Sequence, residues 1–295
     1  MTKPIGFIGI GTMGAPMAMQ LIAAQTPLVI WSRSPTSTDP FKNTHAIIAD
    51  NVTDVFQRCQ TVILMLANSE IIDTILGRNT DQFTQFCRDR TLIQMGTTSP
   101  EYSKRLETDI LNSGGYYAEV PVSGSRIPAE NGELAAMLAG DANTIETIKE
   151  LIAPMIKSST YCGQVPSAMQ MKLAVNTYLS GLMSGLFEAT NFAKLCGLDL
   201  EQFRSVLEAG PMNNNVMRMK LPMIINEDYT SVQASVFQAV ENTRMMRDAG
   251  IEVGAVMPGI ENAYAFQQEA KEAGLTDLDF TSVLEVYKSR NKLPK

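Results

Sequence analysis

The sequence predicts an α/β fold, a doubly wound parallel sheet, followed by an all-helical C-terminal domain. Three observations support this prediction. Short apolar runs alternate with helical stretches through the first half of the chain, a glycine-rich turn follows the first run, and after about residue 162 helical spacing dominates. We therefore expect one domain over residues 1–162 and a second over residues 163–295, joined by a long interdomain helix.

The strands are predicted from apolar runs. The clearest are residues 4–10, 27–31 and 61–66, and the last is the uninterrupted run Thr-Val-Ile-Leu-Met-Leu, typical of a parallel strand covered on both faces. Weaker runs predict further strands at residues 91–95, 116–120 and 135–139. Helices are expected between them at residues 13–25, 69–76 and 100–112, and in the second half at residues 166–195, 199–209, 232–249, 255–273 and 280–290.

Composition excludes several classes of function. The net charge is −7 and the chain has no basic run, so nucleic-acid binding is not expected. A single histidine, His45, and four cysteines without a Cys-x-x-Cys pair make a metal site unexpected. Scattered cysteines fit a reducing compartment. The uncharged stretch between Lys3 and Arg33 is rich in glycine, so we expect a cytoplasmic protein without a membrane span or signal peptide.

A dinucleotide site is predicted at Gly9-Ile10-Gly11-Thr12-Met13-Gly14, a Gly-x-Gly-x-x-Gly turn between the first strand and its helix. In a Rossmann-type domain the first glycine permits the turn, the second admits the pyrophosphate and the third allows close packing of helix on strand. The helix N-terminus offers free N–H groups to the phosphates. A glycine-rich turn without any ligand is the alternative.

The cofactor type is indicated by Trp31-Ser32-Arg33-Ser34, at the end of the second predicted strand. An NAD site places an acid there, but the first acid in this chain is Asp39. Arg33 can pair with a 2′-phosphate and the two serines can hydrogen-bond it, so NADP(H) is preferred over NAD(H). Alternatively, Arg33 is an ordinary solvated charge.

Lys172 is the single charged residue between Ser158 and Phe187. In a helix, Lys172 and Asn176 share one face. An unpaired ammonium on an apolar helix costs free energy, so it is expected to have a polar partner or a function. Partial burial would lower the pKa of the amine and suit it to proton transfer. A lysine whose amine reaches solvent is the alternative, and spacing alone does not choose between them.

Together these motifs resemble the β-hydroxyacid dehydrogenase family, also called 3-hydroxyisobutyrate dehydrogenase-like, over essentially the whole chain. The resemblance rests on the glycine turn, on Glu119-Val120-Pro121-Val122-Ser123-Gly124-Ser125, and on Lys172 with Asn176. The longer segment 121–134, residues 208–213 and Asp277-Leu278-Asp279-Phe280 are similar to the glyoxylate/succinic semialdehyde reductase branch.

The resemblance implies roles for individual residues. Lys172 is the general acid/base, Asn176 orients substrate and lysine, and Ser123 and Gly124 hold the substrate carboxylate. Thr97 lies near the nicotinamide ribose. Leu66, Ala67 and Asn68 end a strand beside the cofactor. The family also implies a homodimer or homotetramer, usually built through the long interdomain helix.

The chain also departs from the family pattern. The glycine-rich turn before the lysine is Pro166-Ser167-Ala168, and the serine that usually precedes Thr97 is Gly96. The Lys-Asp pair of a later helix is Glu241-Asn242, and an upstream aromatic is Ala234. These changes bear on cofactor affinity and substrate choice, and Arg244 could partly compensate.

The sequence thus predicts an NADPH-dependent reductase of small carbonyl substrates that carry a carboxylate, with glyoxylate and succinic semialdehyde first. A dehydrogenase of 3-hydroxyisobutyrate, tartronate or a related 3-hydroxy acid is the enzymatic alternative. Imine reduction is less favoured because relatives with that activity tend to replace the lysine. A cofactor-binding module without catalysis is the alternative from another class.

Overall fold

The structure, a computed structural model, describes residues 3–291. The chain divides into two compact units, Met1–Lys172 and Leu173–Lys295. The division falls inside helix α8 (Ser167–Leu195), whereas the sequence suggests a boundary between residues 162 and 163. The first turn of α8 belongs to the first unit because Val165 and Ala168 are part of that unit's hydrophobic core.

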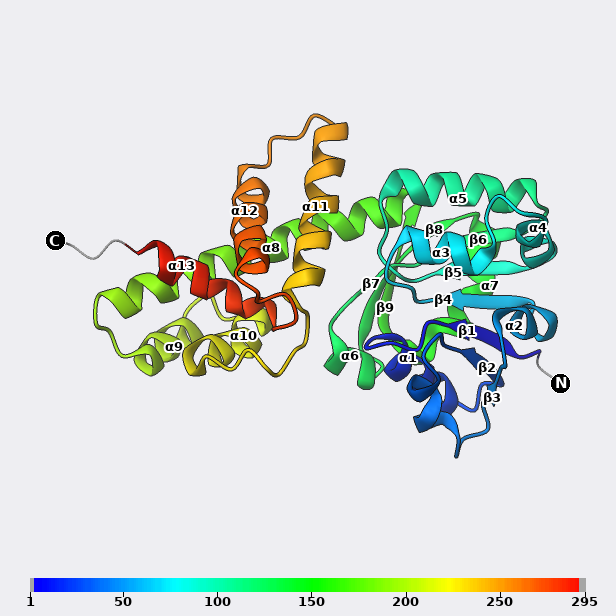
Figure 1. Ribbon diagram of the computed structural model, residues 1–295, viewed down its shortest axis with the longest axis horizontal. Helices are drawn as coiled ribbons and strands as arrows, with labels where there is room; N and C mark the ends of the chain where they lie inside the picture. The colour runs from blue at the N-terminus through cyan, green and yellow to red at the C-terminus, as the bar shows by residue number, and fades with distance from the viewer. Residues whose placement is uncertain (1–2, 292–295) are drawn as a thin grey trace. The chain divides into compact units, whose positions relative to one another are not determined.

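The first unit is built on one sheet, whose parallel part has a Rossmann-type strand order (Figure 1). Its parallel strands are β3 (Ile47–Ile48), β2 (Leu28–Trp31), β1 (Ile5–Ile8), β4 (Thr61–Leu64), β5 (Thr91–Gln94) and β6 (Tyr116–Glu119). The order reverses between β1 and β4, which is where such sheets bind their ligands. The predicted doubly wound parallel sheet is therefore confirmed.

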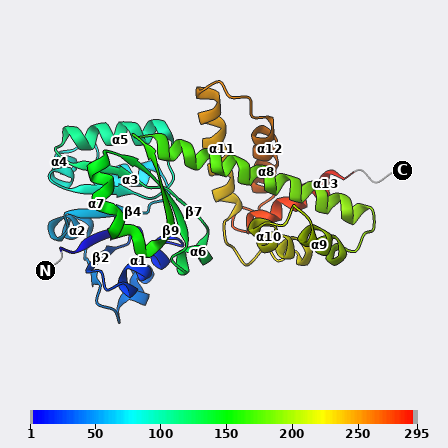
Figure 2. The ribbon, with the colours of Figure 1, turned by 180° about the vertical axis from the view of Figure 1, so that it is seen from behind.

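The sheet continues past β6 with strands that make it mixed. β8 (Leu134–Gly140) is antiparallel to β6 and to β7 (Val122–Ser123), and β9 (Ile156–Gly163) runs parallel beside β8 (Figure 2). The sequence analysis does not predict β7 or β9. Most of β9 is exposed and polar, so it lacks the apolar run that marks a buried strand.

Two apolar layers cover the parallel strands. Phe7 and Ile8 are neighbours in β1, yet they belong to different core clusters on opposite faces of the sheet. Ile63 and Leu64 of β4 divide in the same way. Burial on both faces explains why these strands read as continuous apolar runs.

Helices connect the strands of the first unit. They are α1 (Gly14–Ala23), α2 (Val52–Arg58), α3 (Ser69–Leu76), α4 (Asp81–Cys87), α5 (Pro100–Asn112), α6 (Arg126–Glu130) and α7 (Ala142–Ile152), with the 3₁₀ turns η1 (Pro35–Phe41) and η2 (Ala153–Met155). Side chains cap several of them: Asn51, Asn68, Ser99 and Asp141 accept hydrogen bonds from the first turns of α2, α3, α5 and α7.

The second unit is helical. Most of α8 lies in it, followed by α9 (Leu200–Ala209), α10 (Asn215–Asn226), α11 (Val236–Glu252), α12 (Pro258–Glu272), the 3₁₀ turn η3 (Phe280–Val283) and α13 (Leu284–Arg290). Phe187 of α8, Leu221 of α10 and Val236 of α11 share its main core cluster. The sequence analysis does not predict α10, which carries Pro222 in its interior.

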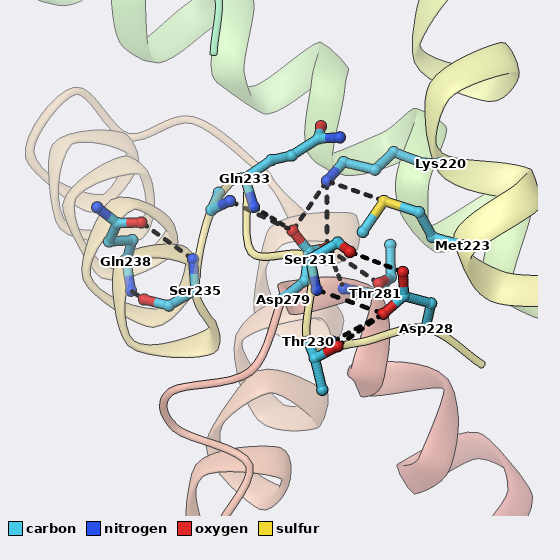
Figure 3. Close-up of polar contacts among 11 residues, drawn as sticks. Lys220, Met223, Asp228, Thr230, Ser231, Gln233, Ser235, Gln238, Asp279 and Thr281 are labelled. Carbon is cyan, nitrogen blue, oxygen red and sulfur yellow. Dashed lines mark hydrogen bonds and ion pairs between the residues drawn. The ribbon is translucent and has the colours of Figure 1, made fainter. Parts of the chain in front are cut away.

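A buried ion pair stabilises the helical unit (Figure 3). The Lys220 amine lies 3.0 Å from Asp279 Oδ2, and both side chains are almost fully buried. Asp279 also accepts hydrogen bonds from the backbone N–H groups of Gln233 and Thr281, at 2.9 and 3.1 Å. Burial lowers the pKa of Lys220, and the Asp279 carboxylate opposes that effect. The connection before α11 is thus tied to α10 and η3.

Candidate active site

The glycine turn lies at the carboxyl end of β1. Gly9 has a φ of +106°, and a Cβ there would stand 2.2 Å from the carbonyl oxygen of Met65. A Cβ on Gly14 would stand 1.9 Å from the carbonyl oxygen of Gly9, so the fold itself requires both glycines.

Gly11 differs from its two neighbours, because a Cβ there would meet no heavy atom within 4 Å. The fold therefore gives no reason for glycine at this position, whereas a pyrophosphate against the backbone would. Met13 occupies the N-cap position of α1, and no side chain caps this helix. The open backbone and the uncapped helix N-terminus fit a dinucleotide held by the loop Gly9, Ile10, Gly11, Thr12, Met13 and Gly14.

The segment after β2 fits a 2′-phosphate. Ser32 is half-buried, while Arg33 and Ser34 are exposed. Within residues 3–291 no ion pair includes the Arg33 guanidinium. Asp39, the first acid after β2, lies in η1, 2.6 Å from the amine of Lys42, which follows that turn. The cation is therefore available to a ligand, and the nearest carboxylate along the chain is engaged elsewhere.

The loop after β4 packs against the glycine turn, and the loop after β5 packs against the loop after β4. A Cβ on Gly9 would meet both Met65 and Leu66, and a Cβ on Gly96 would stand 2.3 Å from the Leu66 carbonyl oxygen. This close approach explains why glycine occupies position 96, where the family has serine. Leu66 thus lies against both Gly9 and Gly96 at the carboxyl edge of the sheet, with Ala67 and Thr97 next to these contacts in sequence.

Asn68 has a structural role in addition to its predicted one. Its side chain caps α3 by accepting a hydrogen bond from the Ile71 N–H at 2.9 Å. The same edge carries two buried polar groups that the sequence analysis misses. Within the described residues, Gln94 Oε1 and Thr98 Oγ1 have no hydrogen-bond partner. Such atoms suit contact with a polar ligand or ordered water.

The segment after β6 holds the residues predicted to bind a carboxylate. Ser123 ends β7 and is half-buried. Gly124 has a φ of +132°, and a Cβ there would stand 2.6 Å from Leu134 Cδ2, so glycine is required. Ser125 Oγ is buried and has no partner among the described residues. A hydroxyl, a glycine backbone and a second hydroxyl thus follow one another in the segment after β6.

Glu119 joins this edge of the sheet to helix α8. The carboxyl is fully buried at the end of β6, and its Oε1 accepts a hydrogen bond from the Met169 N–H at 2.7 Å. The Ser103 hydroxyl donates to Oε2, and the Tyr117 hydroxyl lies 2.9 Å from Ser103 Oγ. Burial raises the pKa of Glu119 to about 7, although the hydrogen bonds from Ser103, Met169 and Ala168 oppose this rise.

From the sequence, Glu119 is only the first residue of a motif and has no predicted role. The contact with Met169 joins residues 50 apart, so no local pattern reveals it. One signal was nevertheless present, because a lone acid ends an otherwise apolar strand.

Lys172 follows Met169 by three residues, so it stands one turn into α8 from the bond to Glu119. The residue is 8% exposed, which disfavours a side chain that reaches solvent. Burial lowers the pKa of its amine to about 8, and no charged neighbour among the described residues contributes to this shift. Asn176 is half-buried one turn further along the same helix. A buried amine of this kind can give up or accept a proton near neutral pH.

The remaining departures from the family pattern lie in the second unit. Glu241 on α11 is paired within the helix, because an Arg244 nitrogen lies 2.9 Å from its carboxylate. Arg244 thus neutralises the acid locally. The backbone N–H of Ala234 donates to Asp279 at 3.3 Å. Nothing in the structure explains asparagine at position 242.

No group of three or more candidate metal ligands occurs in the part of the chain that the structure describes. Over residues 3–291, none of the helices combines the length and the apolar character needed to cross a membrane.

Comparisons with known proteins identify both parts of the chain. Residues 4–163 match the NAD binding domain of 6-phosphogluconate dehydrogenase, and residues 167–287 match the NAD-binding domain of NADP-dependent 3-hydroxyisobutyrate dehydrogenase. Glyoxylate/succinic semialdehyde reductase 1 of Arabidopsis thaliana is 29% identical, over 96% of this chain and 98% of its own length. The chloroplastic reductase 2 of the same plant is 30% identical, over 98% of this chain and 80% of its own length.

A solved structure shares the fold. The 3-hydroxyisobutyrate dehydrogenase of Mycobacterium tuberculosis, in a structure with L-serine, superposes with a TM-score of 0.83 at 22% identity. The match covers 99% of this chain and 100% of that one.

Proposed function

Because the chain belongs to the β-hydroxyacid dehydrogenase family, we propose that it reduces small aldehydo and keto acids to hydroxy acids with NADPH. The protein is an oxidoreductase that binds a pyridine nucleotide. Glyoxylate and succinic semialdehyde are the proposed substrates, since both Arabidopsis relatives carry these names. The observation that carries the proposal is the buried Lys172 amine, one turn into α8 from the point where Glu119 ties that helix to the edge of the sheet.

Proton transfer is the task assigned to Lys172. When bound, the reduced nicotinamide supplies the hydride. The Lys172 ammonium donates a proton to the substrate carbonyl oxygen, and its lowered pKa of about 8 matches this donation near neutral pH. In the reverse direction the neutral amine accepts the hydroxyl proton. Asn176, on the same face of α8, orients the substrate by hydrogen bonding.

Substrate binding is assigned to the segment after β6. The Ser123 hydroxyl and the Gly124 N–H donate to the substrate carboxylate. Thr97, which follows Gly96 in the loop after β5, contacts the substrate and the nicotinamide ribose. Because Gly124 has a φ of +132°, a larger residue there would strain the backbone of the segment that presents this N–H.

Cofactor binding is assigned to three loops at the carboxyl edge: residues 9–14, residues 32–34 and residues 66–68 with Thr97. The preference for NADP(H) rests on the exposed Arg33 guanidinium and the two flanking serines. Arg33→Ala is expected to raise KM for NADPH by roughly tenfold, the loss of a charge-assisted pair, and to leave KM for NADH unchanged. An equal rise for both cofactors would contradict this assignment.

The experiment that tests the activity is a panel of short carbonyl acids with NADPH and NADH, followed by loss of reduced-nicotinamide absorbance. We expect turnover with glyoxylate and succinic semialdehyde. Lys172→Ala should lower kcat by about a thousandfold or more, while the NADPH Kd stays within about threefold. Lys194→Ala is the matched control, since Lys194 lies on the same helix but is exposed and paired with Glu227.

Two other outcomes of the panel have a clear meaning. Oxidation of 3-hydroxyisobutyrate, tartronate or a related 3-hydroxy acid at a higher kcat/KM than any reduction would favour the 3-hydroxyacid dehydrogenase; the first of these substrates is named for the Mycobacterium relative. Cofactor binding without turnover of any substrate would favour a non-catalytic module. The burial of Lys172 argues against the module, because an unused ammonium in that environment only destabilises the fold.

The proposed assembly is a homodimer or homotetramer in the cytoplasm. Met171, Val175 and Tyr178 form an exposed apolar stripe along α8, at helical spacing, which supports self-association. All four cysteines are free, which supports a reducing compartment. Light scattering of the purified protein tests the assembly, and Tyr178→Glu is expected to lower the measured mass.

A further inference from the structure

We propose that Glu119 is a positioning residue: its carboxyl group, braced by Ser103, holds the first turn of α8 and so sets where the Lys172 amine stands. This inference rests on the proposed function for its catalytic readout, but not for its geometry.

The first turn of α8 has few other attachments. A helix leaves its first N–H groups without partners inside the helix. The Ser167 N–H donates to the Gln164 carbonyl oxygen at 2.9 Å, and Pro166 has no N–H to offer. The Met169 N–H donates to Glu119 at 2.7 Å. The Ala168 N–H also favours the ionised form of this carboxyl group and so lowers its pKa. Glu119 therefore satisfies the donors that would otherwise be orphaned in a buried place.

The brace on the other side is equally specific. The Ser103 hydroxyl, from α5, donates to Glu119 Oε2, and the Tyr117 hydroxyl lies 2.9 Å from Ser103 Oγ. All of these groups are buried. A side chain with both oxygens bonded in a packed interior has one rotamer available, so the position of β6 is transmitted to the first turn of α8.

The consequence for Lys172 follows from helix geometry. Lys172 is three residues after Met169, which is about one turn and about 4.5 Å along the axis. A shift of the first turn therefore moves the lysine almost equally. Its amine has no hydrogen bond or ion pair of its own within the described residues, so the backbone and the surrounding packing alone fix it.

The test compares two helix anchors in the same unit. Glu119→Ala removes the anchor of α8. Asp141→Ala removes the cap of α7, because the Asp141 carboxylate accepts a hydrogen bond from the Thr144 N–H at 3.0 Å. Helix α7 carries no proposed site residue. Glu119→Gln keeps an oxygen for Met169 and gains an amide that can donate to Ser103 Oγ. Two readouts are used: kcat with KM for the carbonyl acid, and the pH titration of the Lys172 ¹³Cε resonance in lysine-labelled protein, assigned by its loss in Lys172→Arg.

We expect Glu119→Ala to lower kcat by roughly tenfold to a hundredfold, with little change in KM for NADPH. Its Lys172 resonance should titrate closer to the ordinary lysine value of about 10.4. Glu119→Gln should recover kcat to within about threefold, as a conservative anchor would. Asp141→Ala should leave both readouts at the wild-type values although it lowers Tm.

The inference is overturned if Glu119→Ala keeps the wild-type kcat and lysine titration, or if Asp141→Ala changes both readouts as much. Should Glu119→Ala fail to fold, Ser103→Ala removes only the brace and is read in the same way, with smaller effects of the same direction expected. If the wild type turns over no carbonyl acid, the proposed function fails, and the titration of Lys172 in the variants still decides the positioning role.

Discussion

Replacing Lys172 by methionine is expected to make the protein more stable at neutral pH while it abolishes turnover. Methionine has a similar length and no charge, so it fills the same space without the ammonium. Burial lowers the pKa of Lys172 from 10.5 to about 8. Each pKa unit corresponds to about 1.4 kcal/mol, so keeping Lys172 protonated at pH 7 lowers the free energy of unfolding by about 3 kcal/mol. Methionine carries no charge, so the variant does not have this destabilisation.

The sign of the pH dependence follows from proton linkage. The pKa of Lys172 is lower in the folded state, so between pH 8 and pH 10.5 the unfolded chain binds more protons at this residue than the folded protein does. The wild type therefore regains stability relative to the variant as pH rises through this window. The advantage of Lys172→Met should be largest at and below pH 7 and should nearly vanish above pH 10.5.

The assay is urea unfolding of wild type and Lys172→Met between pH 6 and pH 10, compared as a difference so that other titrating groups cancel. Lys194→Met, at an exposed position of the same helix, is the control and should change stability by less than about 1 kcal/mol at every pH. A methionine variant less stable than wild type at pH 7, or a difference that does not change with pH, would refute the assignment of Lys172 as a buried, unpaired ammonium.

Three further predictions concern the site and its frame. The rate of carbonyl reduction, measured as kcat/KM, should fall as pH rises above about 8, because the acid form of Lys172 is then lost, and the reverse oxidation should rise over the same range. Gly11→Ala should leave Tm unchanged but weaken NADPH binding about tenfold or more by calorimetry, whereas Gly14→Ala should lower Tm by many degrees because its Cβ would overlap backbone. Asp279→Ala should destabilise the helical unit by about 3–5 kcal/mol in urea unfolding, since it leaves the Lys220 charge buried and unpaired; a loss below 1 kcal/mol would contradict that reading.

Much of the fold is visible in the sequence because its signals are local. The predicted helices at residues 69–76 and 100–112 coincide with α3 and α5, where Asn68 and Ser99 provide caps and apolar residues repeat at helical spacing. The buried strands β1 and β4 were equally clear, since both faces are covered. β9 was missed because its side chains are mostly exposed, so pairing with β8, and not an apolar pattern, makes it a strand.

The candidate site was visible in part. Glycine spacing indicates the turn at residues 9–14, but the sequence alone did not show that Gly11 is the position where the fold leaves space. Spacing also leaves both interpretations of Lys172 open, and the burial of its side chain argues against the one in which the amine reaches solvent. Glu119 could not be predicted as an anchor, because its partners Ser103 and Met169 come from other elements of the unit. Contacts between distant segments depend on tertiary packing, which no local pattern encodes.

The buried pair in the helical unit has a consequence for the order of synthesis. Lys220 precedes Asp279 by 59 residues, so a nascent chain on the ribosome carries the lysine well before its counter-ion exists. Until Asp279 has been synthesised, packing of the helices would bury the Lys220 ammonium without a counter-ion. The backbone N–H of Gln233 would also lack its hydrogen-bond acceptor. The sheet of the first unit needs none of these residues. During translation the nucleotide-binding unit should therefore fold first, and the helical unit should fold only after Asp279 has been synthesised.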